Sequence, residues 1–175
     1  MSRTLWGICC FIGGLLLIPV AVAVYLRVGA PPVAVTDPAF PYEKAIVHVP
    51  LDARIHRDMP KDVPLQATAE NLVAGAAIYK QQCAFCHGVP NHPSEIAAHM
   101  YPPAPQLWKG HGHGVVGVSD DPPGETYWKV KNGIRLAGMP AYADLLSENQ
   151  MWQVTLLVAS ADKPLPAEAQ ATLAH

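Results

Sequence analysis

The segment Cys83-Ala84-Phe85-Cys86-His87 decides the fold of this chain. Two thiols separated by two residues match the distance between the two vinyl groups of a porphyrin, so each thiol can add to one vinyl group. The histidine that follows is then carried under the ring, where its imidazole can bind the iron. The motif therefore predicts one covalent haem c, attached through Cys83 and Cys86, with His87 as an axial ligand of the iron.

Cysteine pairs with this spacing also occur in zinc sites and in thiol-redox proteins. A zinc site would need a second ligand pair at similar spacing, and the chain contains no other CxxC. A thioredoxin-like protein would need a βαβ pattern, and no stretch alternates clearly enough to predict a strand. A zinc- or copper-handling domain that combines the motif with His111 and His113 stays an alternative.

Three helices are expected around the motif. The first covers Ala69–Gln82, where apolar residues recur at helical spacing up to Cys83. A middle helix is expected over Pro123–Asn132, because its prolines stand at the tolerated N-terminal end and Gly133 follows its last turn. The last helix starts at Ser147, which forms a capping box with Gln150. The head of the protein is therefore predicted to be all-α.

Residues 68–161 resemble class I monohaem cytochromes c, the small all-α family of bacteria and mitochondria. Gly75 and Tyr79 stand eight and four residues before Cys83, where that family's first helix crosses its last. A glycine at the crossing lets two helix backbones approach closely. Trp152 matches an aromatic of the opposing helix, whereas Leu157 stands where the family has a second aromatic. The resemblance implies a helical domain around one covalent haem.

The resemblance also covers Pro105-Gln106-Leu107, which is similar to the family's Pro-x-Leu after the haem motif. There the proline carbonyl accepts the second ring N–H of the haem histidine, which fixes the tautomer of that imidazole. Pro105 is the best match, although Pro102 and Pro103 are close enough to leave the choice open. By the same resemblance, Leu107 is expected to line the haem.

The stretch Gly138-Met139-Pro140-Ala141-Tyr142 is similar to the family's distal-ligand loop. The resemblance implies that the Met139 sulfur is the sixth ligand of the iron. A His/Met pair fills both axial positions, so the protein is expected to be an electron carrier rather than an enzyme. The alternative is a haem enzyme or gas sensor with an open sixth position.

Four other side chains are of interest around the haem. Trp108 and Arg135 are candidate hydrogen-bond donors to the haem propionates, because an indole N–H and a guanidinium suit carboxylates. His111 and His113 lie in a glycine-rich loop. A structural or propionate-contacting role, an alternative iron ligand and a separate metal site all stay open for these two histidines.

Residues 1–27 are expected to form a transmembrane anchor, because Leu5 to Leu26 contains no charged residue. A helix of that length covers about 33 Å, enough to cross a bilayer core of about 30 Å. Ala21-Val22-Ala23 could also be a signal-peptidase site, so cleavage stays open. Because covalent haem is attached outside the bacterial inner membrane, the expectation is a single-pass protein of that membrane with its haem domain in the periplasm.

Residues 28–67 are expected to be a tether, and residues 162–175 a frayed tail rich in proline and alanine. The tether holds seven prolines, which predict extended chain and no long helix: Pro31, Pro32, Pro38, Pro41, Pro50, Pro60 and Pro64. Its apolar Ile46, Val47, Val49 and Ile55 indicate that part of it lies against the head or a partner protein. The cytochrome domain is then residues 68–161.

The charge of the chain gives no reason to expect nucleic acid as a partner. The formal net charge is −2 with a pI near 6.4. The expected partners are redox proteins in or at the membrane, with no small-molecule substrate. The haem protein would be a subunit of a respiratory or dehydrogenase complex or a partner of one.

Overall fold

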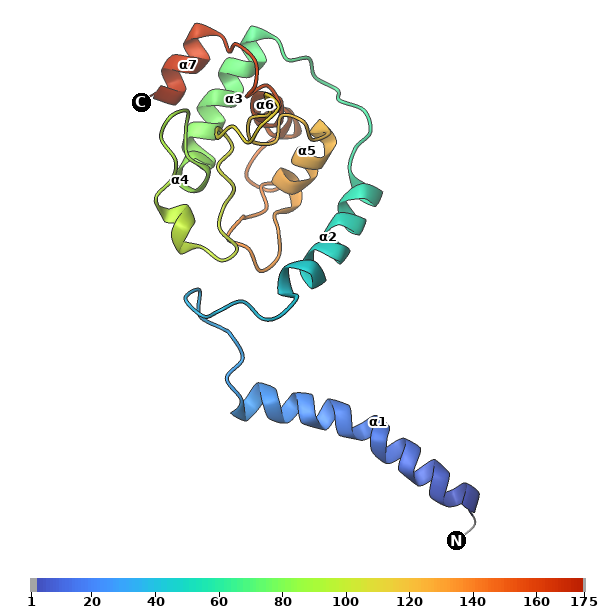
Figure 1. Cartoon of the computed structure of the whole chain (residues 1–175). Coiled ribbons are helices and arrows are strands. Elements are labelled where there is room, and N and C mark those ends of the chain that lie inside the picture. The colour runs from blue at the N-terminus through green and yellow to red at the C-terminus, as the bar shows by residue number, and fades with distance from the viewer. Residues whose placement is uncertain (1–2, 175) are drawn as a thin grey trace. The chain divides into compact units, whose positions relative to one another are not determined.

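The computed structural model describes residues 3–174 and shows a helical chain (Figure 1). Within these residues there are no strands, only the isolated bridges Val89–His92 and Gly110–Val116, so the all-α prediction is confirmed. The elements in chain order are α1 (Arg3–Val28), α2 (Glu43–Asp58), α3 (Ala69–Gln82), α4 (Ala84–His87), the 3-10 helix η1 (Ile96–His99), α5 (Pro123–Asn132), α6 (Glu148–Val158) and α7 (Ala167–Ala174).

The chain divides into two compact units, residues 1–45 and residues 46–175. The first unit contains α1, whose 26 residues carry charge only at Arg3 and Arg27. By length and composition, α1 is the one helix among the described residues that could cross a membrane. The second unit contains the attachment motif and all the helices predicted around it.

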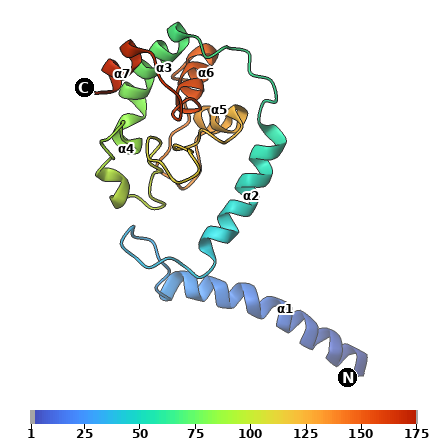
Figure 2. The ribbon, with the colours of Figure 1, turned by 45° about the horizontal axis from the view of Figure 1, so that its top comes forward.

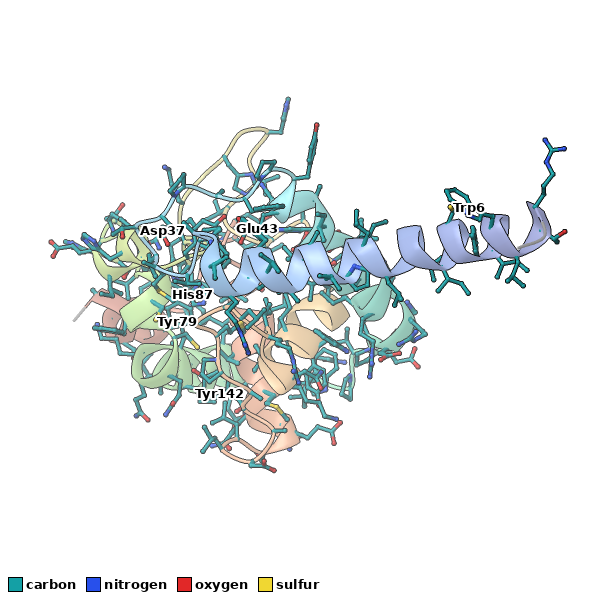
Figure 3. The ribbon with its side chains drawn as sticks, turned by 90° about the horizontal axis from the view of Figure 1, so that it is seen from below. Trp6, Asp37, Glu43, Tyr79, His87 and Tyr142 are labelled. Carbon is teal, nitrogen blue, oxygen red and sulfur yellow. The ribbon has the colours of Figure 1, made fainter. Side chains whose placement is uncertain are left out.

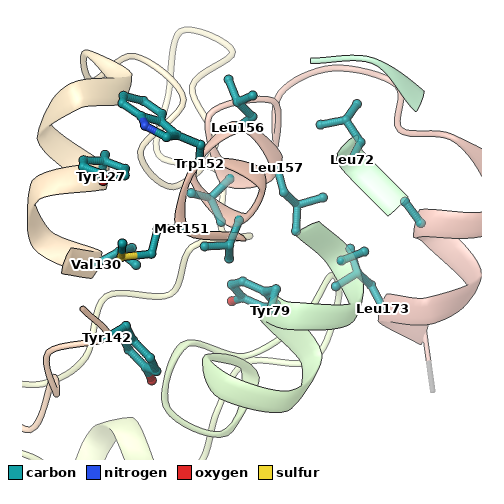
Figure 4. Close-up of a cluster of buried hydrophobic side chains, with 14 residues drawn as sticks. Leu72, Tyr79, Tyr127, Val130, Tyr142, Met151, Trp152, Leu156, Leu157 and Leu173 are labelled. Carbon is teal, nitrogen blue, oxygen red and sulfur yellow. The ribbon is translucent and has the colours of Figure 1, made fainter. Parts of the chain in front are cut away.

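The helices α3 and α6 cross in direct contact at Gly75. A Cβ atom built on Gly75 would overlap the carbonyl oxygen of Gln153 and lie 3.2 Å from the Cβ of Leu157. Only a residue without a side chain allows this approach. Leu157 is fully buried at the crossing (Figure 4), so an aliphatic side chain replaces the second aromatic of the family.

The core is built on the inner faces of α3, α5 and α6. Trp152 of α6 is 1% exposed and stacks on Tyr127 of α5, with 4.1 Å between the ring centroids. Met151 and Val130 lie in the same cluster (Figure 4). The helix α6 begins with the predicted capping box, in which the Ser147 hydroxyl accepts from the Gln150 amide and the Gln150 side chain accepts from the Ser147 amide.

The prediction of a frayed C-terminal tail was wrong, because residues 167–174 form α7. Ala169 and Leu173 are both fully buried, and α7 lies beside α3 in Figures 1 and 2. These two residues are four apart and therefore point to the same side of the helix. The alanines that suggested disorder are also the best helix formers, and packing against α3 selects the helix.

The prediction that prolines exclude a long helix from residues 28–67 was also wrong, because α2 runs for 16 residues with Pro50 inside it. Proline removes one backbone hydrogen bond and clashes with the preceding turn. Burial of Ile55, which is 2% exposed, offsets part of this cost. Just beyond α2, the backbone of Pro60 touches the first turn of α5 so closely that a Cβ on Gly124 would overlap the Pro60 carbonyl oxygen.

Candidate haem attachment site

The attachment turn, residues 82–88, joins the end of α3 to the short helix α4. Its fold is local, since the amides of Cys86 and His87 both donate to the Cys83 carbonyl, at 3.1 and 2.9 Å. Gly88 ends the turn with φ +70°, a conformation that favours glycine. The thiols of Cys83 and Cys86 are both free, and burial raises the pKa of the Cys83 thiol to about 12.

Every backbone carbonyl of the attachment turn accepts a hydrogen bond. Amides within the turn donate to the carbonyls of Cys83 and Ala84. Groups from elsewhere in the chain serve the other five: Tyr142 Oη to Gln82 O (2.8 Å), Ser94 Oγ to Phe85 O (2.5 Å), Gln106 Nε2 to Cys86 O (3.3 Å), the Leu107 amide to His87 O (3.3 Å) and Tyr79 Oη to Gly88 O (2.7 Å). The backbone that carries the motif is therefore fixed from several sides.

The imidazole of His87 is oriented by Pro105. Nδ1 of His87 lies 2.7 Å from the Pro105 carbonyl oxygen, which can only accept, so Nδ1 carries the proton and donates. Burial lowers the pKa of His87, and the bond to Pro105 opposes that shift. The neutral ring then has its free lone pair on Nε2, the atom available to a metal. Of the three prolines considered from the sequence, Pro105 is the one that makes this bond.

The Met139 loop, residues 133–143, follows α5 directly. Its backbone rests on the end of α5, since the Tyr142 amide donates to Val130 O (3.1 Å) and the Ala143 amide to Lys131 O (3.2 Å). Gly133 has φ +65°, and a Cβ there would lie 2.7–2.8 Å from the backbone of residues 139–141. Met139 itself is half-buried and packs against the core cluster.

The attachment turn and the Met139 loop meet through the hydroxyl of Tyr142, which donates to Gln82 O. Figure 3 labels Tyr142 together with His87 of the turn. Burial raises the pKa of the Tyr142 hydroxyl, and the neighbouring thiols of Cys83 and Cys86 raise it further. The structure thus brings together Cys83, Cys86 and the loop that carries Met139. Residues 60 positions apart in the chain make this contact.

The two predicted propionate donors differ in their surroundings. Trp108 packs edge-on against Tyr79, with 5.5 Å between centroids, and its Nε1 is buried with no hydrogen-bond acceptor among the described residues. A buried N–H without an acceptor is costly, so this atom fits a carboxylate of a bound group. Arg135 is exposed on the Met139 loop and makes no hydrogen bond or ion pair within residues 3–174, so its contact with a propionate stays a prediction.

The histidine-rich loop is held by its own hydrogen bonds. Nε2 of His111 lies 2.7 Å from the Gly117 carbonyl oxygen, and the His111 amide donates to Val115 O. His113 is exposed with φ +50°. In the described part of the chain, no group of three or more histidine, cysteine, aspartate or glutamate side chains gathers that could hold a metal ion. The structure therefore favours a structural role for His111.

A haem fits the residues that the structure assembles. Leu107, Trp108 and Met139 are partly buried beside the core, on apolar surface suited to a porphyrin. Cys83 and Cys86 offer free thiols, His87 offers an oriented nitrogen, and Trp108 offers an unpaired donor.

Sequence reasoning missed two residues that shape this site. Gln106 accepts from the Ser94 amide at 2.6 Å and donates to Cys86 O, so it joins the attachment turn to the segment that contains Ser94. The resemblance of the distal loop includes Tyr142 but assigns it no role, although its hydroxyl makes the bond to Gln82. For Gln106, its place inside Pro-x-Leu was a usable signal, whereas no local pattern pairs Tyr142 with Gln82.

Comparison with known proteins agrees with this geometry. The family model described as cytochrome c oxidase, cbb3-type, subunit III matches residues 70–157, just over half of the chain. No curated protein and no solved structure matches. Proteins of this family bind haem c covalently, and one haem per domain is typical. The resemblance to class I cytochromes c is thereby confirmed, and the chain belongs to the family of cbb3-type cytochrome c oxidase subunit III, as a c-type cytochrome with one covalent haem c.

Proposed function

We propose that this protein is a membrane-anchored electron-transfer cytochrome whose haem iron is ligated by His87 and Met139, and that it works as a subunit or partner of a membrane oxidase or dehydrogenase complex. Electron transfer by a c-type cytochrome follows from the family. The proposal adds the ligand pair, the membrane anchor and the partner complex to this family activity.

The hydrogen bond between His87 and Pro105 carries the proposal. It holds the imidazole by Nδ1 and leaves Nε2 as the atom that can bind a metal, which suits an axial ligand. The Leu107 amide holds the His87 carbonyl at 3.3 Å, so ring and backbone are both fixed. A ligand fixed in this way changes little when the charge of a bound metal changes.

Met139 supports the proposal from the opposite segment. Its loop is closed onto α5 and tied to the attachment turn through Tyr142, and its side chain is half-buried against the core. A thioether at the sixth position favours the reduced state and closes the site to added ligands. A bound haem would supply one-electron oxidation and reduction, and the partly buried Leu107, Trp108 and Met139 would offer it apolar surface.

The anchor is supported by α1, which is uncharged between Arg3 and Arg27 and whose large apolar side chains are exposed. Exposed apolar residues between Leu5 and Leu26 suit a lipid environment better than water. The proposed location is the bacterial inner membrane, with the haem domain in the periplasm. The matching family is described as an oxidase subunit, which supports a partner complex in the same membrane.

Two matched variants test the ligand pair. Met139→Leu keeps volume and apolarity but removes the sulfur, so the weak red-edge absorption band of a methionine–iron bond should disappear from the oxidised protein. Met100→Leu should retain the band. If Met139→Leu keeps the band, or if the unaltered protein binds carbon monoxide rapidly and tightly, the proposed ligand pair is wrong.

The intact mass of the purified protein tests the anchor. An uncleaved chain should carry the full sequence plus one haem and should stay in the membrane fraction after an alkaline wash. A mass that matches a chain beginning after Ala23 would show that a signal peptide has been cleaved, and it would remove the anchor from the proposal.

A further inference from the structure

We infer that Tyr142 is a positioning residue whose hydroxyl fastens the Met139 loop to the end of α3, directly before the first attachment cysteine. The inference rests on the proposed ligation by Met139, which it deepens. It concerns the hydroxyl group alone, because the ring of Tyr142 also belongs to the core.

The geometry gives Tyr142 two attachments at once. Its amide donates to Val130 O in the last turn of α5, at 3.1 Å, and its hydroxyl donates to Gln82 O, at 2.8 Å. The residue is 7% exposed, so water does not compete freely for either bond. Tyr142 therefore joins the end of α5, which precedes the Met139 loop, to the end of α3, which precedes the attachment turn; Figure 4 labels Tyr142 with Val130 of α5 and Tyr79 of α3.

The acceptor is a group that needs a partner. Gln82 is the last residue of α3, and the last carbonyls of a helix have no amide of their own helix to accept from. These carbonyls also form the negative end of the helix dipole, which strengthens a bond from a hydroxyl donor. A phenylalanine in place of Tyr142 would leave the Gln82 carbonyl without its donor.

Among the donors to the attachment turn, Tyr142 is the one that comes from the Met139 loop. Tyr79 belongs to α3 itself, and Ser94, Gln106 and Leu107 all belong to the chain between α4 and α5. Those bonds would stay intact if the Met139 loop moved away. The Tyr142 hydroxyl bond would break, because it is the direct tie between the loop and the turn.

Loss of the hydroxyl should therefore loosen the loop without unfolding the protein. The backbone bonds of residues 139–143 to α5 would remain, and the ring would still fill its place in the core. The loop would leave the site more often, and the Met139 sulfur, three residues away, would leave with it. A group that acts only through another residue should show this effect in dynamics and ligand access before it shows in overall stability.

The test compares Tyr142→Phe with Tyr127→Phe in the full-length, haem-loaded protein in detergent. Tyr127 is a matched control, because it is a buried tyrosine of the same cluster whose hydroxyl makes no hydrogen bond within residues 3–174. Hydrogen–deuterium exchange of residues 134–143 should be about five- to tenfold faster in Tyr142→Phe, the range expected for one lost hydrogen bond. Cyanide binding to the oxidised protein should accelerate by a similar factor, and Tyr127→Phe should change neither.

Exchange in the Met139 loop that stays within twofold of the unaltered protein would overturn the inference. Equal acceleration in Tyr127→Phe would also overturn it, because the effect would then reflect core packing. If the unaltered protein lacks the methionine–iron band, the proposed ligation fails instead. In that case the exchange comparison still decides whether the Tyr142 hydroxyl fastens the loop, since the bond from this hydroxyl to Gln82 O needs no methionine–iron bond.

Discussion

The attachment turn and the Met139 loop belong to the same site but are held in different ways. In the turn, all seven backbone carbonyls have hydrogen-bond donors, five of them from other parts of the chain. The loop rests on the end of α5 and on one tyrosine hydroxyl, and it contains Leu136, which is 90% exposed with φ +61°. The attachment turn is therefore held to the rest of the domain by many hydrogen bonds and the Met139 loop by few.

This difference indicates where the site should open first. Local opening is easiest where few buried contacts and few hydrogen bonds must break together. The Met139 loop meets that description and the attachment turn does not. Changes to the loop should therefore affect the methionine–iron bond, whereas changes to the turn should affect the stability of the whole domain.

The largest effect is expected from Gly133→Ala. Gly133 has φ +65°, and an added Cβ would lie 2.7 Å from the Ala141 amide nitrogen and 2.8 Å from Met139 O. Strain and overlap together should lower the free energy of unfolding by about 3 kcal/mol. Urea titration would measure this loss, and the methionine–iron band should weaken at urea concentrations below the unfolding transition.

Gly110→Ala is the control for that change, because Gly110 is not in a left-handed conformation and the nearest atom to an added Cβ is Val115 O at 3.8 Å. It should shift stability by less than about 1 kcal/mol. A similar loss in both glycine variants would contradict the special role given to Gly133.

An intermediate effect is expected from Gln106→Ala on the other side of the comparison. The Ser94 amide and the Cys86 carbonyl would lose their partner, at a cost of about 2 kcal/mol in unfolding free energy. The band should remain until the domain unfolds. Gln81→Ala is the control, since that exposed side chain makes no hydrogen bond in the described part of the chain. Early loss of the band in Gln106→Ala would remove the distinction between the two sides.

The smallest effect is expected from Leu136→Gly, and it has the opposite sign. The left-handed conformation at Leu136 strains a leucine but not a glycine, so stability should rise by about 0.5 kcal/mol after the entropy cost of glycine is subtracted. Leu145→Gly should lower stability, because Leu145 is another exposed leucine but has an ordinary backbone conformation. Differential scanning calorimetry would compare the two, and a loss in both would show that Leu136 is not strained.

Local signals predicted the helices around the site well. The first helix was expected over Ala69–Gln82 and the middle one over Pro123–Asn132, and the structure has both with these bounds. Caps, end prolines and helical periodicity act within one turn, so they can be read from neighbouring residues. The His87–Pro105 bond was also expected, but from the family resemblance rather than from the residues alone.

The errors arose where tertiary packing overrides local preference. Pro50 argues against a helix, yet α2 forms and buries Ile55. The tail looks disordered by composition, yet α7 buries Leu173 against α3. The Tyr142–Gln82 bond joins residues 60 positions apart, and no short pattern contains both. In each case the deciding partner lies far away in the sequence.

The helical state of α2 has a consequence for how far the haem domain can travel from the bilayer, if α1 anchors the chain as proposed. Sixteen residues of extended chain reach about 53 Å, whereas 16 residues of helix cover about 24 Å. The tether is therefore shorter than the extended chain that its prolines predict. A shorter tether confines the domain to a smaller volume near the membrane. The effective concentration of an acceptor embedded close to α1 rises accordingly.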